Sequence, residues 1–277
     1  VSLVRRSRVA DRLHASLIAA ACVIGLVGMA SAAAGVLTGQ LSWLRALAWL
    51  GLWWFVVPVY VTVAHRMVPF FTAAAVPLLD AWRPNWLLWT LLGAVASQGG
   101  WFVLDACGVG GAPVLLVRAL VSGLSCAMVV GLAIRWGLVQ SLKIRLLAML
   151  HLGFVWLGLS LGLDALASLQ AWFGAAGQPL ASLHALTMGF LGSVLIAMAT
   201  RVSCGHGGRA LAADDLAWAI FLALQLAVVL RLLAIWLPVG GPWWLSAAAT
   251  VWLAALAAWA VRYGRWFGRP RLDGRPG

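Results

Sequence analysis

Two histidines and one methionine carry most of the metal-binding chemistry that this sequence offers. His184 and Met188 stand four residues apart in an apolar run, so on a helix they share one face. An imidazole nitrogen and a thioether sulfur form a soft ligand pair that suits copper or haem iron. His151, in a second apolar run, is the other candidate metal ligand. Core packing also favours methionine at this spacing, so both interpretations of Met188 stay open.

The segments that must position these residues are apolar enough to cross a membrane. Of the 277 residues, 64% are apolar and 9% are charged, and the mean hydropathy is +1.00. A soluble domain carries about 25% charged residues. We expect an all-α, polytopic transmembrane bundle that forms one integral membrane domain over residues 1–277 and contacts the lipid bilayer. Eight spans are predicted near 15–37, 43–64, 86–105, 113–134, 145–167, 180–200, 215–237 and 243–262.

The basic residues predict the orientation of this bundle. All Lys and Arg residues except Arg45, Arg118 and Arg231 fall at the two termini or in alternate connections. By the positive-inside rule both termini are predicted to be cytoplasmic. Arg5, Arg6 and Arg8 are among the N-terminal residues of this group, and Arg275 is among the C-terminal ones. A second interpretation of the first span is a signal peptide cleaved near residues 30–32.

Five ionisable residues are predicted to lie at one level beneath the outer membrane face. Ionisable groups inside a bilayer are costly and therefore mark functional candidates. A rise of about 1.5 Å per residue puts His184 about 25 Å from the cytoplasmic face. The other four, from four different spans, are Asp105, Arg118, Asp164 and Arg231.

Two explanations of this cluster remain open. The arginines can form ion pairs with Asp105 or Asp164 and tie helices together. Alternatively, His184 is an axial ligand of a haem, while Arg118 and Arg231 bind its anionic propionates.

The other histidines are predicted to lie nearer the cytoplasmic face. His151 is about 9 Å above that face, and roughly 16 Å from the level of His184. The two therefore do not ligate one iron. His65 and His14 are better matched to His151 in depth, which predicts a second cofactor-binding level or a structural histidine.

A glycine-rich basic segment ends the span that carries His184. It reads Cys-Gly-His-Gly-Gly-Arg over residues 204–209, and Arg201, His206 and Arg209 are candidates for holding an anion or a partner surface. A tight turn between two spans explains the same residues. Asp214 and Asp215 are predicted to cap the next helix.

Several functional classes find no support in the sequence. The formal net charge of +12 is spread over short loops and termini, which argues against a nucleic-acid site. The four cysteines form no close-spaced pair, and no P-loop, nucleophile elbow, HExxH or paired-carboxylate signature occurs. The sequence assigns no catalytic residue.

Three stretches together resemble the NnrS family. Residues 183–211 resemble its most recognisable segment. Residues 65–71 are similar to its G-R-x-I-P-x-F segment, with His where Gly is usual, and residues 150–157 to its L-H-x-G-Y-x-W-L segment. Their order and spacing match over about residues 40–215. Members usually have more helices, and we expect an N-terminal portion of the family pattern to be missing here.

The resemblance implies both a location and a function. NnrS proteins are polytopic inner-membrane proteins described as haem- and copper-containing and linked to the bacterial response to nitric oxide. The motif positions are His151, His184, Arg201, Gly205, His206 and Arg209. The absence of a CxxCH site predicts b-type haem. We also expect copper as a second metal, and a partner membrane subunit or a second copy of the chain in a homo-oligomer as a binding partner. The alternatives are a small-solute transporter or channel and a structural subunit of a redox (denitrification) complex.

Overall fold

The computed structural model describes residues 12–237 and 239–274, and every regular element within these ranges is a helix. Arg5, Arg6, Arg8 and Arg275 lie outside the described residues. Contacts divide the chain into two compact units, one of Val1–Phe70 with Asp80–Arg118 and one of Phe71–Leu79 with Ala119–Gly277. The single integral domain stays a prediction, as does the position of the termini.

The first unit is built from the N-terminal helices. In chain order these are α2 (Leu13–Leu37), the short η1 (Leu41–Trp43), α3 (Leu44–Gly51), η2 (Leu52–Val56), most of α4 (Val57–Ala75), α5 (Asn85–Ala106) and the start of α6 (Ala112–Arg135). The α2 helix packs on α3 and η2, and α5 packs on η2.

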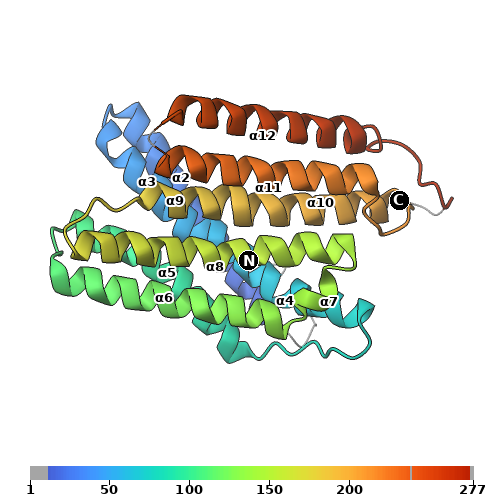
Figure 1. Cartoon of the computed structure of the whole chain (residues 1–277), viewed down its shortest axis with the longest axis horizontal. Coiled ribbons are helices and arrows are strands. Elements are labelled where there is room, and N and C mark those ends of the chain that lie inside the picture. Colours follow the sequence, from blue (N-terminus) through green and yellow to red (C-terminus); the bar gives the residue numbers. More distant parts are fainter. Residues whose placement is uncertain (1–11, 238, 275–277) are drawn as a thin grey trace. The chain divides into compact units, whose positions relative to one another are not determined.

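The second unit takes the ends of α4 and α6 and the rest of the chain (Figure 1). Its elements are α7 (Leu138–Ser141), α8 (Arg145–Trp172), α9 (Pro179–His184), η3 (Ala185–Gly192), α10 (Ser193–His206), α11 (Asp215–Trp236) and α12 (Gly241–Gly264). The continuous run α9–η3–α10 packs between α8 and α11, and α12 covers α11.

The prediction of eight spans is confirmed for the described residues, because eight helices are long and apolar enough to cross a membrane. Three of them are clearly longer than predicted. The second covers Leu41–Ala75 and not 43–64, the fifth covers Arg145–Trp172 and not 145–167, and the sixth covers Pro179–His206 and not 180–200. The second and the sixth continue past Arg66 and Arg201, because long basic side chains can reach polar surroundings from within a helix.

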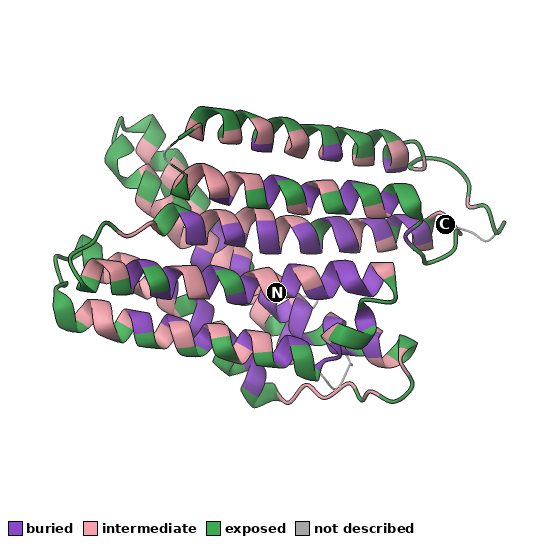
Figure 2. Ribbon diagram, viewed as in Figure 1, coloured by how far each residue is buried: buried purple, intermediate pink, exposed green. Residues whose placement is uncertain are grey.

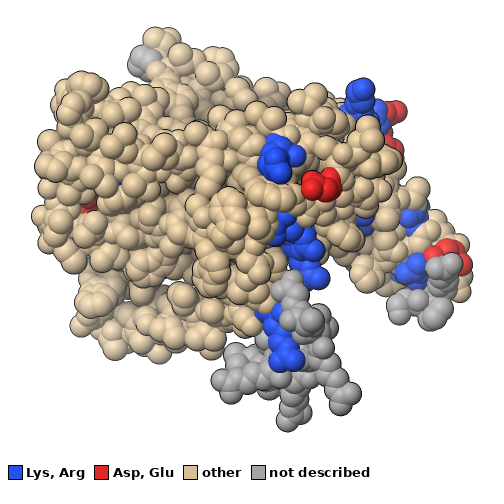
Figure 3. Space-filling model, turned by 90° about the horizontal axis from the view of Figure 1, so that it is seen from below, with Lys and Arg blue, Asp and Glu red and all other residues tan. Residues whose placement is uncertain are grey.

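The surface of the protein suits lipid. Figure 3 shows charged side chains at few places on a predominantly uncharged surface. In the second unit, burial is concentrated in α8 and in the α9–η3–α10 run, while α12 is mainly exposed (Figure 2). Large apolar residues such as Leu26, Met29 and Leu253 are more than 60% exposed, as expected where acyl chains are the solvent.

Glycines let α8 approach its neighbours closely. A Cβ atom at Gly153 would lie 2.9 Å from Val194 of α10. At Gly158 and Gly162 it would lie 3.0 Å from side-chain atoms of Val130 and Cys126 of α6. Helices in lipid associate largely through such close packing, since lipid tails are as apolar as the helices themselves.

Two segments, η2 and η3, are π-helical, with the wider i→i+5 hydrogen bonding that often marks functional sites. Both pack by setting an aromatic ring on a glycine. In the first unit η2 supplies Trp54, whose ring covers Gly99 and whose indole nitrogen donates to the Ala96 carbonyl at 3.0 Å. In the second unit η3 supplies the glycine, because Gly189 faces Trp156 of α8. Gly189 therefore serves close packing between helices.

The Trp54 contact gives a direct test of this packing. Gly99→Ala places a methyl group against the Trp54 ring, whereas Gly100→Ala, one residue later, meets open space. Both changes gain the same helix propensity, but overpacking at residue 99 costs about 1–3 kcal/mol. We expect Gly99→Ala to lower the midpoint of thermal unfolding in detergent and Gly100→Ala to leave it equal or higher. Equal midpoints for the two variants would contradict the packing argument.

Candidate functional site

His184 lies where the sixth span changes from α-helix to π-helix. It is the last residue of α9, and η3 begins at Ala185. Its imidazole is half-buried, and it forms no hydrogen bond to any residue that the structure describes. A neighbouring contact holds α9 on α8, since the Ser160 hydroxyl donates to the Ser182 carbonyl at 3.0 Å. The backbone at His184 is therefore fixed, while the imidazole nitrogens remain available to a ligand.

Arg231 of α11 is the charged neighbour of His184. The α9 and α11 helices pack together, and the guanidinium lies close enough for its charge to act on the His184 imidazole. Arg231 is partly buried within the seventh span, and it has no hydrogen bond or ion pair to a described residue. The two side chains therefore bring an imidazole without a hydrogen bond and a positive charge without an ion pair close together.

The other three residues of the predicted outer cluster form two separate contacts. Arg118 makes an ion pair with Asp105 at 3.4 Å in the first unit, as the helix-tying explanation proposed. Asp164 is buried in the second unit and accepts a hydrogen bond from Ser122 at 2.8 Å. Both carboxylates therefore have partners.

Met188 packs with apolar side chains. It lies against the cluster of Ala181, Val228 and Leu232, which joins α9 to α11. This placement matches the core-packing interpretation of its four-residue spacing from His184. Its role as a metal ligand stays a prediction.

His151 is fully buried in the second unit, near the basic end of α8. Its Nε2 lies 2.9 Å from the hydroxyl oxygen of Thr72, at the end of α4. Its Nδ1 is also buried and has no hydrogen-bond partner among the described residues. The imidazole is thus oriented by one hydrogen bond and leaves one nitrogen unsatisfied.

The three stretches that resemble one family meet beside this imidazole. Phe71, the last residue of the first stretch, lies under the Arg201 guanidinium, which is 3.9 Å from the ring centroid. Thr72, the next residue, contacts His151 of the second stretch. Arg201 belongs to the third. The contact of Arg201 with the Phe71 ring is structural, because a guanidinium stacked on an aromatic ring helps to hold the two segments together.

The glycine-rich segment forms a turn between α10 and α11. The α10 helix ends at His206, and Gly208 has a φ of +64°, which favours glycine. Arg209 stacks on Trp266, 4.0 Å from its ring centroid. The predicted cap is confirmed, since Asp214 accepts a hydrogen bond from the Ala217 amide at 3.0 Å. His206 and Arg209 lie at the opposite end of the sixth span from His184.

His14 and His65 form a pair in the first unit. The Nε2 atom of His14 lies 3.1 Å from the Nδ1 atom of His65, and both side chains are buried. The expected match in depth between these residues is realised as a direct contact, whereas His151 has Thr72 as its partner.

A chain of polar contacts that the sequence did not predict joins three helices of the second unit. The Trp156 indole of α8 donates to Gln225 of α11 at 2.7 Å, and the Gln225 amide donates to the Ser193 hydroxyl of α10 at 2.8 Å. Gln225 is an uncharged polar residue inside an apolar span, and this was the available signal. These contacts lie beside Gly189 and so help to hold η3 in place.

The described residues define a polytopic helical membrane protein with paired polar groups between its helices. The chain matches the NnrS protein family over residues 1–271, and it belongs to that family. The match is longer than the 40–215 inferred from three stretches, and it includes the first span. The expected loss of an N-terminal portion stays a prediction. No curated protein and no solved structure matches this chain.

The Thr72–His151 contact predicts a stability effect. Thr72→Val keeps the shape of the side chain but removes the hydroxyl, which leaves a buried imidazole without its hydrogen bond. The expected cost is about 1–3 kcal/mol of unfolding free energy. The control is Thr90→Val, because Thr90 is exposed and its hydroxyl donates to a carbonyl of its own helix. Denaturation in mixed micelles should separate the two variants, and equal stability would count against the hydrogen bond.

Proposed function

We propose that this NnrS-family chain binds b-type haem in a bacterial inner membrane and takes part in the response to nitric oxide. The observation that carries the proposal is the juxtaposition of His184 and Arg231. Both side chains lie in apolar spans, and neither has a hydrogen bond or ion pair with a described residue. An arginine without a counter-ion is costly in a membrane, so an anionic ligand beside it is favoured.

The residues at this place fit a haem group. A half-buried imidazole without an internal hydrogen bond can donate a nitrogen lone pair to iron. The Arg231 guanidinium can form paired hydrogen bonds with a carboxylate such as a propionate. Apolar side chains line the same helix contact, among them Leu163, Leu232 and Ile235. Arg118 is less suited to a propionate, because Asp105 already neutralises it.

The haem group and the residues of the chain would have different roles. Bound haem would supply an iron coordination position for nitric oxide. His184 would hold the iron from one side, and Arg231 would balance the propionate charge. The apolar side chains around them would exclude water. The η3 segment would fix the direction of the imidazole, since Gly189 and Trp156 prevent this part of the helix from sliding.

The optical spectrum of protein purified after haem-replete expression tests the proposal. Wild type should show a Soret band that shifts on reduction with dithionite. His184→Ala should abolish or shift the band, because the axial nitrogen is lost. Arg231→Gln should leave the position of the band unchanged but weaken haem binding about tenfold or more, since one charge-assisted interaction is worth about 1.5–3 kcal/mol.

His206→Ala is the matched control, because this histidine belongs to the same span but lies at its other end. Its spectrum should equal that of wild type. A wild-type protein without a Soret band would overturn the haem proposal and favour a structural subunit or a transporter. An unchanged spectrum in His184→Ala would remove His184 as the ligand and leave His151 as the next candidate.

We infer that copper, the second metal associated with this family, binds the His14–His65 pair. The nitrogen atoms that face each other are 3.1 Å apart. Two imidazole nitrogens on one tetrahedral ion, with bonds of about 2.0 Å, are separated by about 3.3 Å. Imidazole nitrogen is a ligand that suits copper.

Copper content measured by mass spectrometry tests this assignment separately from haem. After copper-replete expression, His14→Ala and His65→Ala should each reduce bound copper to background while the Soret band remains. His206→Ala should retain the wild-type copper content. Retention of copper by both single variants would contradict the site.

A further inference from the structure

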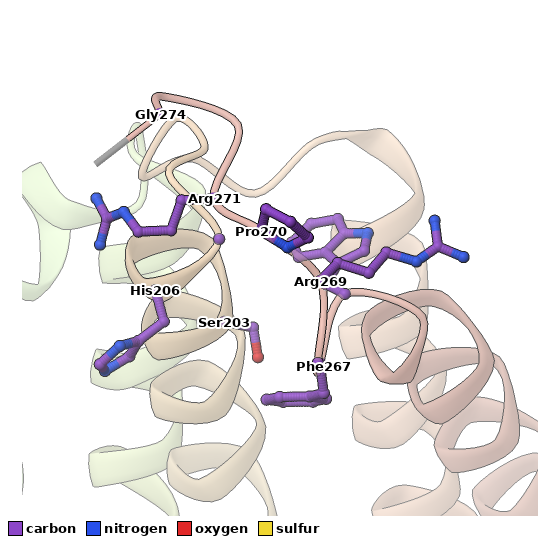
Figure 4. A pocket seen from close by; sticks show the side chains of 10 residues that line it. Ser203, His206, Phe267, Arg269, Pro270, Arg271 and Gly274 are labelled. Carbon is purple, nitrogen blue, oxygen red and sulfur yellow. The ribbon is translucent and has the colours of Figure 1, made fainter. Parts of the chain in front are cut away.

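A pocket of about 440 Å³ lies between the end of α10 and the segment that follows α12. The α10 side contributes Ser203 and His206, and the C-terminal side contributes Trp266, Phe267, Arg269 and Arg271 (Figure 4). Neither the haem nor the copper proposal uses this pocket.

The glycine-rich turn builds one wall of the pocket by receiving the C-terminal segment. The Leu272 amide donates to the Gly207 carbonyl at 3.1 Å. A Cβ atom at Gly208 would lie 2.7 Å from the Asp273 carboxylate, so this close approach requires glycine. Gly207 and Gly208 therefore let the C-terminal segment pack against the turn. This contact brings basic residues from two segments to one pocket.

The rim of the pocket carries positive charge that internal acidic groups do not cancel. Asp273 neutralises Arg271 through two hydrogen bonds of 2.9 and 2.6 Å. Arg269 and His206 have no ion pair with any residue that the structure describes. The nearest acidic residues of the turn into α11 are also engaged, since Asp214 pairs with Arg262 and Asp215 with Arg145.

The walls between these charges are mainly apolar. Phe267 is 62% exposed, and Trp266 is partly buried under the Arg209 guanidinium. In Figure 4, Ser203 and Phe267 face the space between the two segments, while the side chains of His206 and Arg269 extend outward on opposite sides of it. The pocket thus combines a basic rim, one hydroxyl and aromatic walls, which suits a ligand with an anionic head and an apolar body.

We propose that this pocket binds the phosphate headgroup of an anionic phospholipid, with the glycerol and upper acyl chain against Phe267 and Trp266. It opens at the ends of two helices that are long and apolar enough to cross a membrane, where headgroups lie. Basic pockets between membrane helices on the cytoplasmic side bind such headgroups. The exposed Phe267 gives a free phosphate no benefit, but it contacts a lipid chain favourably.

Lipid binding to the whole chain tests the proposal. Native mass spectrometry of detergent-purified protein, titrated with short-chain phosphatidylglycerol or phosphatidylcholine, reports each bound lipid. Wild type should bind phosphatidylglycerol in preference to phosphatidylcholine. Arg269→Gln should weaken phosphatidylglycerol binding about fivefold, since a basic residue near anionic lipid is worth about 1 kcal/mol. His206→Asn should act in the same direction, and Phe267→Ala should weaken binding of both lipids.

Arg265→Gln is the matched control. It removes the same charge from the same segment, but Arg265 does not line the pocket and donates to the Val261 carbonyl. Equal losses in Arg265→Gln and Arg269→Gln would overturn the proposal in favour of a general surface charge. Displacement of phosphatidylglycerol by equimolar inorganic phosphate would overturn it in favour of a free-anion site. Haem and copper contents should not change in these variants, so either result is independent of the metal proposals.

Discussion

The second unit depends on close packing at positions that lack a side chain. In lipid, helices gain little by hiding apolar surface from one another, and contact distance decides how well they associate. Gly153 admits Val194 on one side of α8, while Gly158 and Gly162 admit α6 on another. The α8 helix consequently becomes the most buried of the eight candidate spans in the described chain. The buried imidazole of His151 and the carboxylate of Asp164 are both carried by this helix, and its neighbours supply their partners.

The π-helical segment η3 uses this close packing to position His184, the residue directly before it. A wider helical turn redirects the residues before it relative to those after it, and the rings of Trp156 and Trp252 lock the turn in place through Gly189 and Gly192. His184 stands at the junction, beside Arg231. The same span ends in a glycine turn with a different task, since that turn seats the C-terminal segment. One continuous helical run therefore carries two chemically distinct places, an imidazole beside a guanidinium near one end and a pocket lined by basic residues at the other.

Much of this arrangement could be predicted from the sequence, because lipid imposes simple rules on it. Hydropathy gave the eight spans, and the acidic pair before the seventh span identified the cap at Asp214. The contacts between distant residues could not be predicted. Thr72 lies 79 residues from His151 in the chain, and only the folding of the second unit makes it the partner of that imidazole. The pairing of His14 with His65, 51 residues apart, has the same origin. Nor did composition reveal the π-helical turn, whose residues are as apolar as those of an ordinary helix.

Chemical rescue at residue 184 tests the proposal that His184 holds a haem iron. His184→Gly removes the imidazole and leaves space where it stood. We expect this variant to lose the wild-type Soret band and added imidazole to restore it, because a free ligand can take the place of the missing side chain. A His184→Gly protein with the wild-type spectrum in the absence of imidazole would contradict the account.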